Sequence, residues 1–94
     1  MTTNTLSSSI EWLDRLVAFD TTSRLSNLAL IDDVQNYLRE LGIPTRLTRN
    51  DEGSKANLWA TIGPEDRGGV VLSGHTDVVP VDGQEWSRDP FKMH

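Results

Sequence analysis

The chain has 94 residues, of which 36% are hydrophobic and 24% are charged, so it forms at most one globular unit. It contains no cysteine, which excludes a disulfide framework, a cysteine nucleophile and a thiolate metal site. Its net charge of -5 argues against nucleic-acid binding. It has neither a long apolar run nor a secretory signal. We therefore expect a cytoplasmic protein without nucleic-acid or membrane partners.

A first helix is predicted near the start of the chain. Ser8 and Glu11 form a capping-box pattern, in which the side chain of each residue accepts a hydrogen bond from the backbone N–H of the other. Apolar residues follow at helical spacing from Ile10 to Val17. This pattern predicts a helix over residues 9–19.

A polar connection, residues 21–27, separates this helix from a second one. Ser26 or Asn27 is a suitable N-cap, and Gly42 is a suitable left-handed stop. Between them the apolar residues recur every three or four positions: Leu30, Ile31, Val34, Leu38 and Leu41. These signals predict a helix over residues 27–41.

Three strands are predicted after the helices. Residues 44–50 alternate between apolar and polar, and residues 56–62 form a second strand-like run. The turn-forming residues 51–54 lie between them, which allows a hairpin. Residues 70–72, Val-Val-Leu, are continuously apolar, which is typical of a strand buried on both faces of an α/β sheet. Residues 75–94 are expected to form an ordered loop.

The residues that carry chemistry follow this third strand. His75 and Asp77 are two apart on extended backbone, so their side chains project to the same side. Gly74 leaves room beside the imidazole for an ion or a substrate. Imidazole is a common metal ligand, and its second nitrogen usually donates to a carboxylate or a carbonyl. A structural His–Asp hydrogen bond explains the pair equally well, whereas a triad with Ser73 is disfavoured because triads join distant segments.

A longer stretch of sequence favours a metal-ligand role for His75 over a purely structural hydrogen bond between His75 and Asp77. The matching residues are Ser73-Gly74-His75-Thr76-Asp77-Val78-Val79-Pro80-Val81, Trp86 and Asp89-Pro90-Phe91, with upstream segments 19–23, 41–43 and 57–60. Together they resemble the acetylornithine deacetylase and succinyl-diaminopimelate desuccinylase family of zinc amidohydrolases. The resemblance covers essentially the whole chain.

The resemblance implies roles for two residues. His75 matches the first zinc ligand of the family, and Asp77 matches the acidic residue that orients this histidine for catalysis. The complete enzymes hold two Zn2+ ions, for which Co2+ can substitute, and their other ligands occur later in the chain. Glu85 and Asp89 do not match those ligands, and we do not expect His94 to be a ligand.

The resemblance also implies a fold. Residues 1–94 would be the N-terminal part of a three-layer α/β catalytic domain, containing two helices, a strand pair and a central buried strand. The rest of that domain and the dimerisation domain would be absent, and the full-length enzyme would be a homodimer. A piece of this kind would expose apolar surface and self-associate.

The implied reaction is the zinc-dependent hydrolysis of N2-acetyl-L-ornithine to L-ornithine and acetate, a step in arginine biosynthesis. The substrate is thus a small N-acyl amino acid, and these residues alone are expected to be inactive. Two alternatives stay open. One is a related hydrolase, such as a desuccinylase, an aminoacylase or a dipeptidase. The other is a non-enzymatic α/β remnant in which His75 and Asp77 are only structural.

Overall fold

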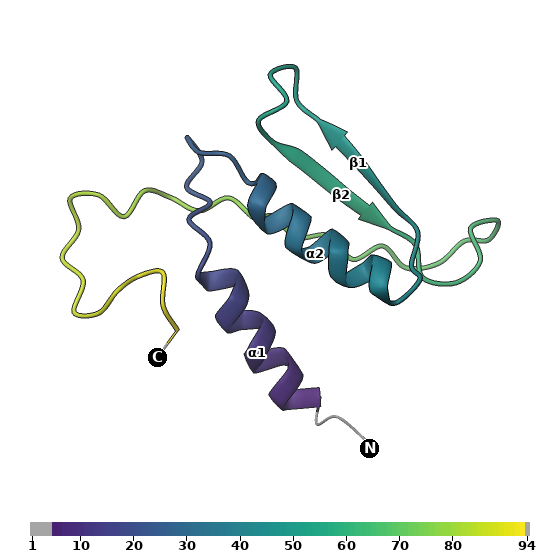
Figure 1. Cartoon of the computed structure of the whole chain (residues 1–94), viewed down its shortest axis with the longest axis horizontal. Coiled ribbons are helices and arrows are strands. Elements are labelled where there is room, and N and C mark those ends of the chain that lie inside the picture. The colour runs from purple at the N-terminus through teal and green to yellow at the C-terminus, as the bar shows by residue number, and fades with distance from the viewer. Residues whose placement is uncertain (1–4, 94) are drawn as a thin grey trace.

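A computed structural model describes residues 5–93 of the chain. Helix α1 (Thr5–Val17) and helix α2 (Leu28–Glu40) precede strands β1 (Thr45–Arg49) and β2 (Ala56–Ala60), as Figure 1 shows. The predicted α/β class, with two helices followed by a strand pair, is confirmed. Neither of the described helices has the length and apolar character needed to cross a bilayer.

Helix α1 begins earlier than predicted. It starts at Thr5 and not at residue 9, so Ser8 lies inside the helix and does not cap it. The apolar spacing accounts for this difference, because Leu6 lies four residues before Ile10 and extends the stripe by one turn. The capping-box prediction was therefore wrong.

The end of α2 follows its predicted stop signal. Gly42 adopts a φ of +74°, a conformation that side chains with a Cβ rarely adopt. Its N–H donates to the carbonyl of Arg39 at 2.9 Å, and the N–H of Ile43 donates to the carbonyl of Leu38 at 3.0 Å. This pair of bonds is a Schellman motif, which satisfies carbonyls that the helix end would otherwise leave free.

Strands β1 and β2 form the predicted antiparallel hairpin. Its turn is organised by Asn50, whose side-chain oxygen accepts from the N–H groups of Ser54 and Lys55 at 2.9 and 3.1 Å. Gly53 supplies the positive φ of the turn. Exposed and more buried residues alternate along most of both strands, as expected for a sheet with one solvated face.

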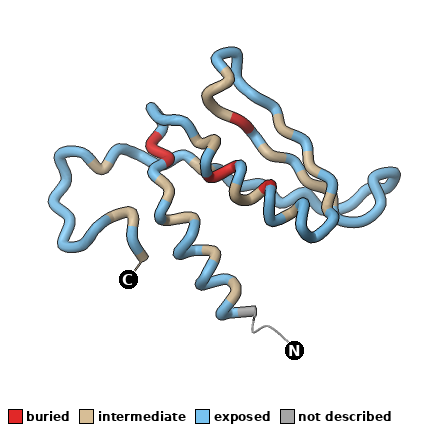
Figure 2. Tube along the Cα trace, viewed as in Figure 1, coloured by how far each residue is buried: buried red, intermediate tan, exposed pale blue. Residues whose placement is uncertain are grey.

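The hydrophobic core lies between α2 and the hairpin. Leu30 and Ile31 of α2 and Ala56 of β2 are buried. Figure 2 shows buried segments in red on α2, on the hairpin and in the connection before α2. Partly buried residues pack around them: Leu16, Phe19, Leu28, Val34, Leu47 and Leu58. Only three hydrophobic residues among those described fall into the buried class, so this core is small for a chain of this length.

The predicted central strand at residues 70–72 is absent from the structure. Val70, Val71 and Leu72 are 88%, 66% and 92% exposed, and the segment is not a strand. A strand buried on both faces needs neighbours on both sides, but within residues 5–93 strands β1 and β2 pair only with each other. The segment instead lines an open groove of about 1070 Å³, opposite residues of the hairpin that include Trp59.

The described part of the chain is open and flat. Its radius of gyration is 15.6 Å, and its extents are 48 × 42 × 22 Å. A compact domain of this length has a radius of gyration of about 12 Å. Together with the exposed apolar segment at residues 70–72, this shape describes an incomplete α/β unit.

This exposed surface predicts self-association of the 94-residue chain. Val70→Lys combined with Leu72→Lys places two charges on the exposed apolar segment and is expected to shift the chain towards monomer in sedimentation velocity. Thr48→Lys combined with Ser87→Lys adds the same charge at exposed polar positions and is the matched control. A parent chain that sediments as a compact monomer at every concentration would contradict the prediction.

Candidate metal-ligand site

His75 and Asp77 are in direct contact. The Nδ1 atom of His75 lies 2.9 Å from Oδ1 of Asp77 and 3.1 Å from the Asp77 backbone carbonyl. Both of these oxygens are acceptors, so Nδ1 carries the proton and donates it. The neutral ring then has its lone pair on Nε2, which is the arrangement of a histidine ready to bind a metal ion.

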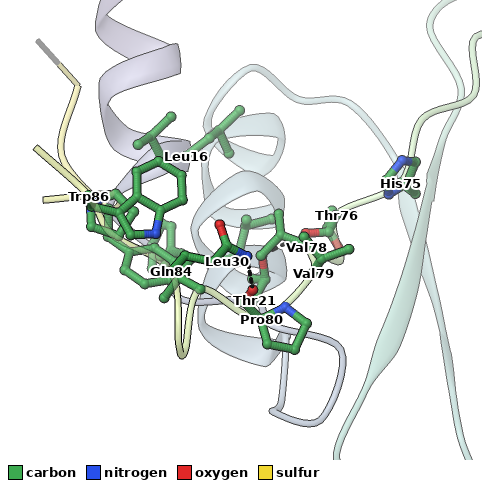
Figure 3. A pocket seen from close by; sticks show the side chains of 15 residues that line it. Leu16, Thr21, Leu30, His75, Thr76, Val78, Val79, Pro80, Gln84 and Trp86 are labelled. Atoms are coloured by element: carbon green, nitrogen blue, oxygen red, sulfur yellow. Dashed lines mark hydrogen bonds between the residues drawn. The ribbon is translucent and has the colours of Figure 1, made fainter. Parts of the chain in front are cut away.

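The ring of His75 faces solvent. Its side chain is 85% exposed, and that of Asp77 is 62% exposed. In Figure 3 the ring lies apart from Leu16 and Trp86, which occupy the opposite end of the residues drawn. The imidazole is therefore accessible to an incoming ion and is not packed among aliphatic side chains.

The backbone of the site segment, residues 75–79, is held by the connection before α2. Thr22 and Val78 form an isolated parallel β-bridge. The Val78 N–H donates to the carbonyl of Thr21, and the Ser23 N–H donates to the carbonyl of Val78, each at 3.1 Å. The Thr21 hydroxyl also donates to the carbonyl of Thr76 at 2.6 Å. Figure 1 shows these two segments meeting beside the start of α2.

The connection before α2 is itself rigidly built around Thr22, which is only 1% exposed. Oδ1 of Asp20 accepts from both the backbone N–H of Thr22 at 3.1 Å and its hydroxyl at 2.6 Å. The hydroxyl bond, followed by the N–H bond, lowers the pKa of Asp20 below its usual value, because both bonds stabilise the carboxylate. A charged Asp20 thus fixes the loop that positions the site.

Asn27 ties the site segment to the sheet. Its amide donates to the carbonyl of Ala56 at 2.9 Å and to the Thr76 hydroxyl at 3.3 Å, and its oxygen accepts from the Ala56 N–H at 3.0 Å. The side chain of Asn27 makes no capping bond to α2. The Ser26 hydroxyl accepts from the N–H of Leu28 at 3.1 Å and serves that helix start instead.

The second oxygen of the Asp77 carboxylate also has a partner. Oδ2 accepts from the Ser23 hydroxyl at 2.9 Å. The hydrogen bond from Ser23, followed by the one from His75, lowers the pKa of Asp77 below its usual value. Asp77 is therefore an ionised carboxylate held at both oxygens. The sequence pattern drew attention to His75 and Asp77 but not to Ser23, because Ser23 is 54 residues away in the chain.

The described residues fit one ligand position of a zinc site but do not complete a site. A catalytic zinc takes three protein ligands, and residues 5–93 contain no group of three or more potential His, Asp or Glu ligands. Asp89 accepts from the N–H of Phe91 at 2.9 Å, in the turn that its sequence predicted. His94 lies outside the described residues.

A cavity of about 450 Å³ lies between α1 and the C-terminal segment. Its walls are mainly apolar and include Leu16, Phe19, Val79 and Phe91. Trp86 and His75 also line this cavity, and Figure 3 shows them at its opposite ends. The cavity is therefore a mainly apolar hollow that reaches the site residue His75.

Comparison with known proteins finds relatives that are named acetylornithine deacetylase. The chain is similar to acetylornithine deacetylase of Pasteurella multocida, with 49% identity over 70 residues. It is also similar to the acetylornithine deacetylases of Proteus mirabilis, with 42% identity over 77 residues, and Buchnera aphidicola from Schizaphis graminum, with 40% identity over 68 residues. The resemblance expected from the sequence is confirmed: the chain is related to acetylornithine deacetylase.

The similarity covers most of this chain but little of each relative. The alignments span 72%, 81% and 72% of the chain for the Pasteurella, Proteus and Buchnera proteins. They span 18%, 20% and 18% of those relatives. The chain thus matches about a fifth of the length of the curated relatives. No family model matches the chain, and no solved structure matches it.

The lowered pKa of Asp20 predicts an acid-sensitive loop. A carboxylate whose pKa is lowered by folding adds stability above its unfolded pKa, and this stability is lost as the pH falls through the folded pKa. We expect the Thr22 amide signal in NMR to move as the pH is lowered below about 4, the usual range of an aspartate. Asp20→Asn should abolish this titration, whereas Asp51→Asn, in the hairpin turn, should leave it unchanged.

Proposed function

We propose that this chain contributes the first zinc ligand of an acetylornithine deacetylase. The observation that carries the proposal is the exposed His75 ring, whose Nδ1 is held by Asp77 and whose Nε2 is left open, in a chain related to acetylornithine deacetylases. The proposed reaction is the hydrolysis of N2-acetyl-L-ornithine to L-ornithine and acetate, a step in arginine biosynthesis in the cytoplasm. The similarity to named deacetylases supports this choice over other N-acyl amino acid hydrolases.

In this proposal the two site residues have different tasks. His75 binds one of two Zn2+ ions through Nε2, with Co2+ as a possible substitute. Asp77 accepts the hydrogen bond that the Nδ1–H group of His75 donates, and this bond keeps the ring in the correct tautomer and orientation. Bound zinc would supply an activated water and would polarise the acyl carbonyl of the substrate.

The remaining ligands and the general base belong, in this proposal, to parts of the enzyme that these 94 residues do not include. The lack of three-ligand groups among residues 5–93 supports this division. The chain is then the N-terminal part of the catalytic domain, and the complete enzyme is a homodimer with a separate dimerisation domain. The 94-residue chain alone should have no deacetylase activity.

A chimera tests the role of His75 directly. Residues 1–94 would replace the matching segment of the Pasteurella multocida relative, and deacetylation of N2-acetyl-L-ornithine and zinc content would be measured. We expect His75→Ala to lose most of the turnover and at least one zinc ion, because the substitution removes one of the few protein ligands that a catalytic zinc has.

The matched control for this experiment is His94→Ala, which removes the other histidine of the chain and should retain both activity and metal. The unfused 94-residue chain serves as the inactive reference. Unchanged zinc content and turnover in the His75→Ala chimera would rule out the ligand assignment. A chimera that prefers another N-acyl amino acid would redirect the substrate proposal.

The orienting role of Asp77 predicts a smaller, graded effect. In the same chimera we expect Asp77→Ala to weaken zinc binding by about 10–100-fold, the usual consequence of removing the partner of a metal-bound histidine. Titration calorimetry with zinc measures this change. Asp82→Ala, which removes a nearby carboxylate paired with Arg24, is the control. Equal zinc affinities for the parent and the Asp77→Ala chimera would contradict the role.

A further inference from the structure

We propose that Ser23 is a positioning residue that fixes Asp77 and, through it, the tautomer and direction of the His75 ring. This inference deepens the proposed function and rests on His75 being the ligand. Ser23 belongs to the connection before α2, 54 residues before Asp77 in the sequence. Its hydroxyl lies 2.9 Å from Oδ2 of Asp77.

The geometry divides the Asp77 carboxylate between two partners. Oδ1 faces Nδ1 of His75 at 2.9 Å, and Oδ2 faces the Ser23 hydroxyl at 2.9 Å. A carboxylate with both oxygens engaged has one preferred rotation about its Cβ–Cγ bond. Without the second bond, the 62% exposed side chain of Asp77 could turn towards water. Ser23 therefore supplies the restraint that burial does not.

The hydroxyl of Ser23 has one proton to give, and two acceptors lie near it. Besides Oδ2 of Asp77, the backbone carbonyl of Val78 lies 3.3 Å away. The bond to Asp77 is shorter and is assisted by the negative charge of the carboxylate, so it takes the proton. This choice makes Ser23 a partner of the site and not only of the backbone.

Ser23 can transmit a fixed position because its own backbone is fixed on both sides. Its N–H donates to the carbonyl of Val78 at 3.1 Å, and its carbonyl accepts from the ammonium group of Lys55. The preceding residue, Thr22, is the most buried of the described side chains and is bridged to Val78. The buried Thr22 thus fixes the position of Ser23, and the Ser23 hydroxyl in turn fixes the exposed side chains of Asp77 and His75.

A second consequence concerns what Asp77 does not do. With one oxygen accepting from His75 and the other from Ser23, each oxygen of Asp77 already uses one of its lone pairs on a protein donor. Ser23 thereby favours the orienting role of Asp77 over direct binding of the ion by its carboxylate.

The test reads the tautomer of His75 without relying on catalysis. The 94-residue chain, labelled with ¹⁵N-histidine, would be studied by NMR at about pH 8, where imidazole is neutral. His75→Gln identifies the ring signals of His75. Each variant would be prepared in the natural chain and in the Val70→Lys/Leu72→Lys background, and the tautomer ratio would be compared between the two.

Three substitutions at Ser23 separate the hydroxyl from the shape of the side chain. We expect Ser23→Ala and Ser23→Val to lower the ratio of the Nδ1–H to the Nε2–H tautomer by roughly 3- to 10-fold, less than the loss of a direct partner would. Ser23→Thr keeps the hydroxyl and should preserve the ratio. Ser87→Ala, on the exposed C-terminal segment, should also preserve it.

The amide signals of Thr22 and Val78 report whether the backbone bridge survives each substitution. If Ser23→Ala disrupts the bridge, the comparison of Ser23→Thr with Ser23→Val decides, because these side chains have the same shape and differ in the hydroxyl. Equal tautomer ratios for Thr and Val would overturn the inference, as would an unchanged ratio in Ser23→Ala with the bridge intact. The ligand proposal is judged separately, by the zinc content of the His75→Ala chimera, so its failure would leave the tautomer ratios as the measure of the role of Ser23.

Discussion

The pairing of Thr22 with Val78 brings together segments that are more than 50 residues apart, and the site exists only where they meet. Closing a loop of this length costs roughly 3–4 kcal/mol of chain entropy. Four hydrogen bonds join residues 21–23 to residues 76–78, and at about 1 kcal/mol each they offset this cost. The contact is therefore close to balanced and depends on each of its members, which is why the burial of Thr22 and the charge of Asp20 matter to a site that neither residue touches.

Asn27 extends this pairing to the sheet. Its side-chain amide forms hydrogen bonds with the backbone N–H and carbonyl of Ala56 and with the hydroxyl of Thr76. It therefore joins β2 to the site segment without a strand between them. Ala56 is part of the small core, and the core therefore holds the site segment indirectly. His75 and Asp77 remain solvent-exposed, while their neighbours Thr76 and Val78 are bonded to residues 21–23 and to Asn27.

The accuracy of the sequence predictions followed the range of the interactions involved. The stop at Gly42 and the hairpin turn at residues 51–54 depend on residues close to them in the sequence, and both were predicted. The contact between His75 and Asp77 is also local, so the pair could be found from its spacing. The strand predicted at residues 70–72 depends on distant neighbours, and the described residues do not supply them. Ser23 was assigned to a polar connection and Asn27 to a possible helix N-cap, since nothing in their local pattern indicates contacts with residues 76 and 77.

The arrangement of this contact has a consequence for biosynthesis. Every residue that seats the imidazole, from Asp20 to Val78, lies within one stretch of fewer than 60 residues. A ribosome releases such a stretch as one continuous segment, and proteins begin to fold during translation. The contact between His75 and Asp77, and the pairing that holds it, can thus form without any residue from outside this stretch.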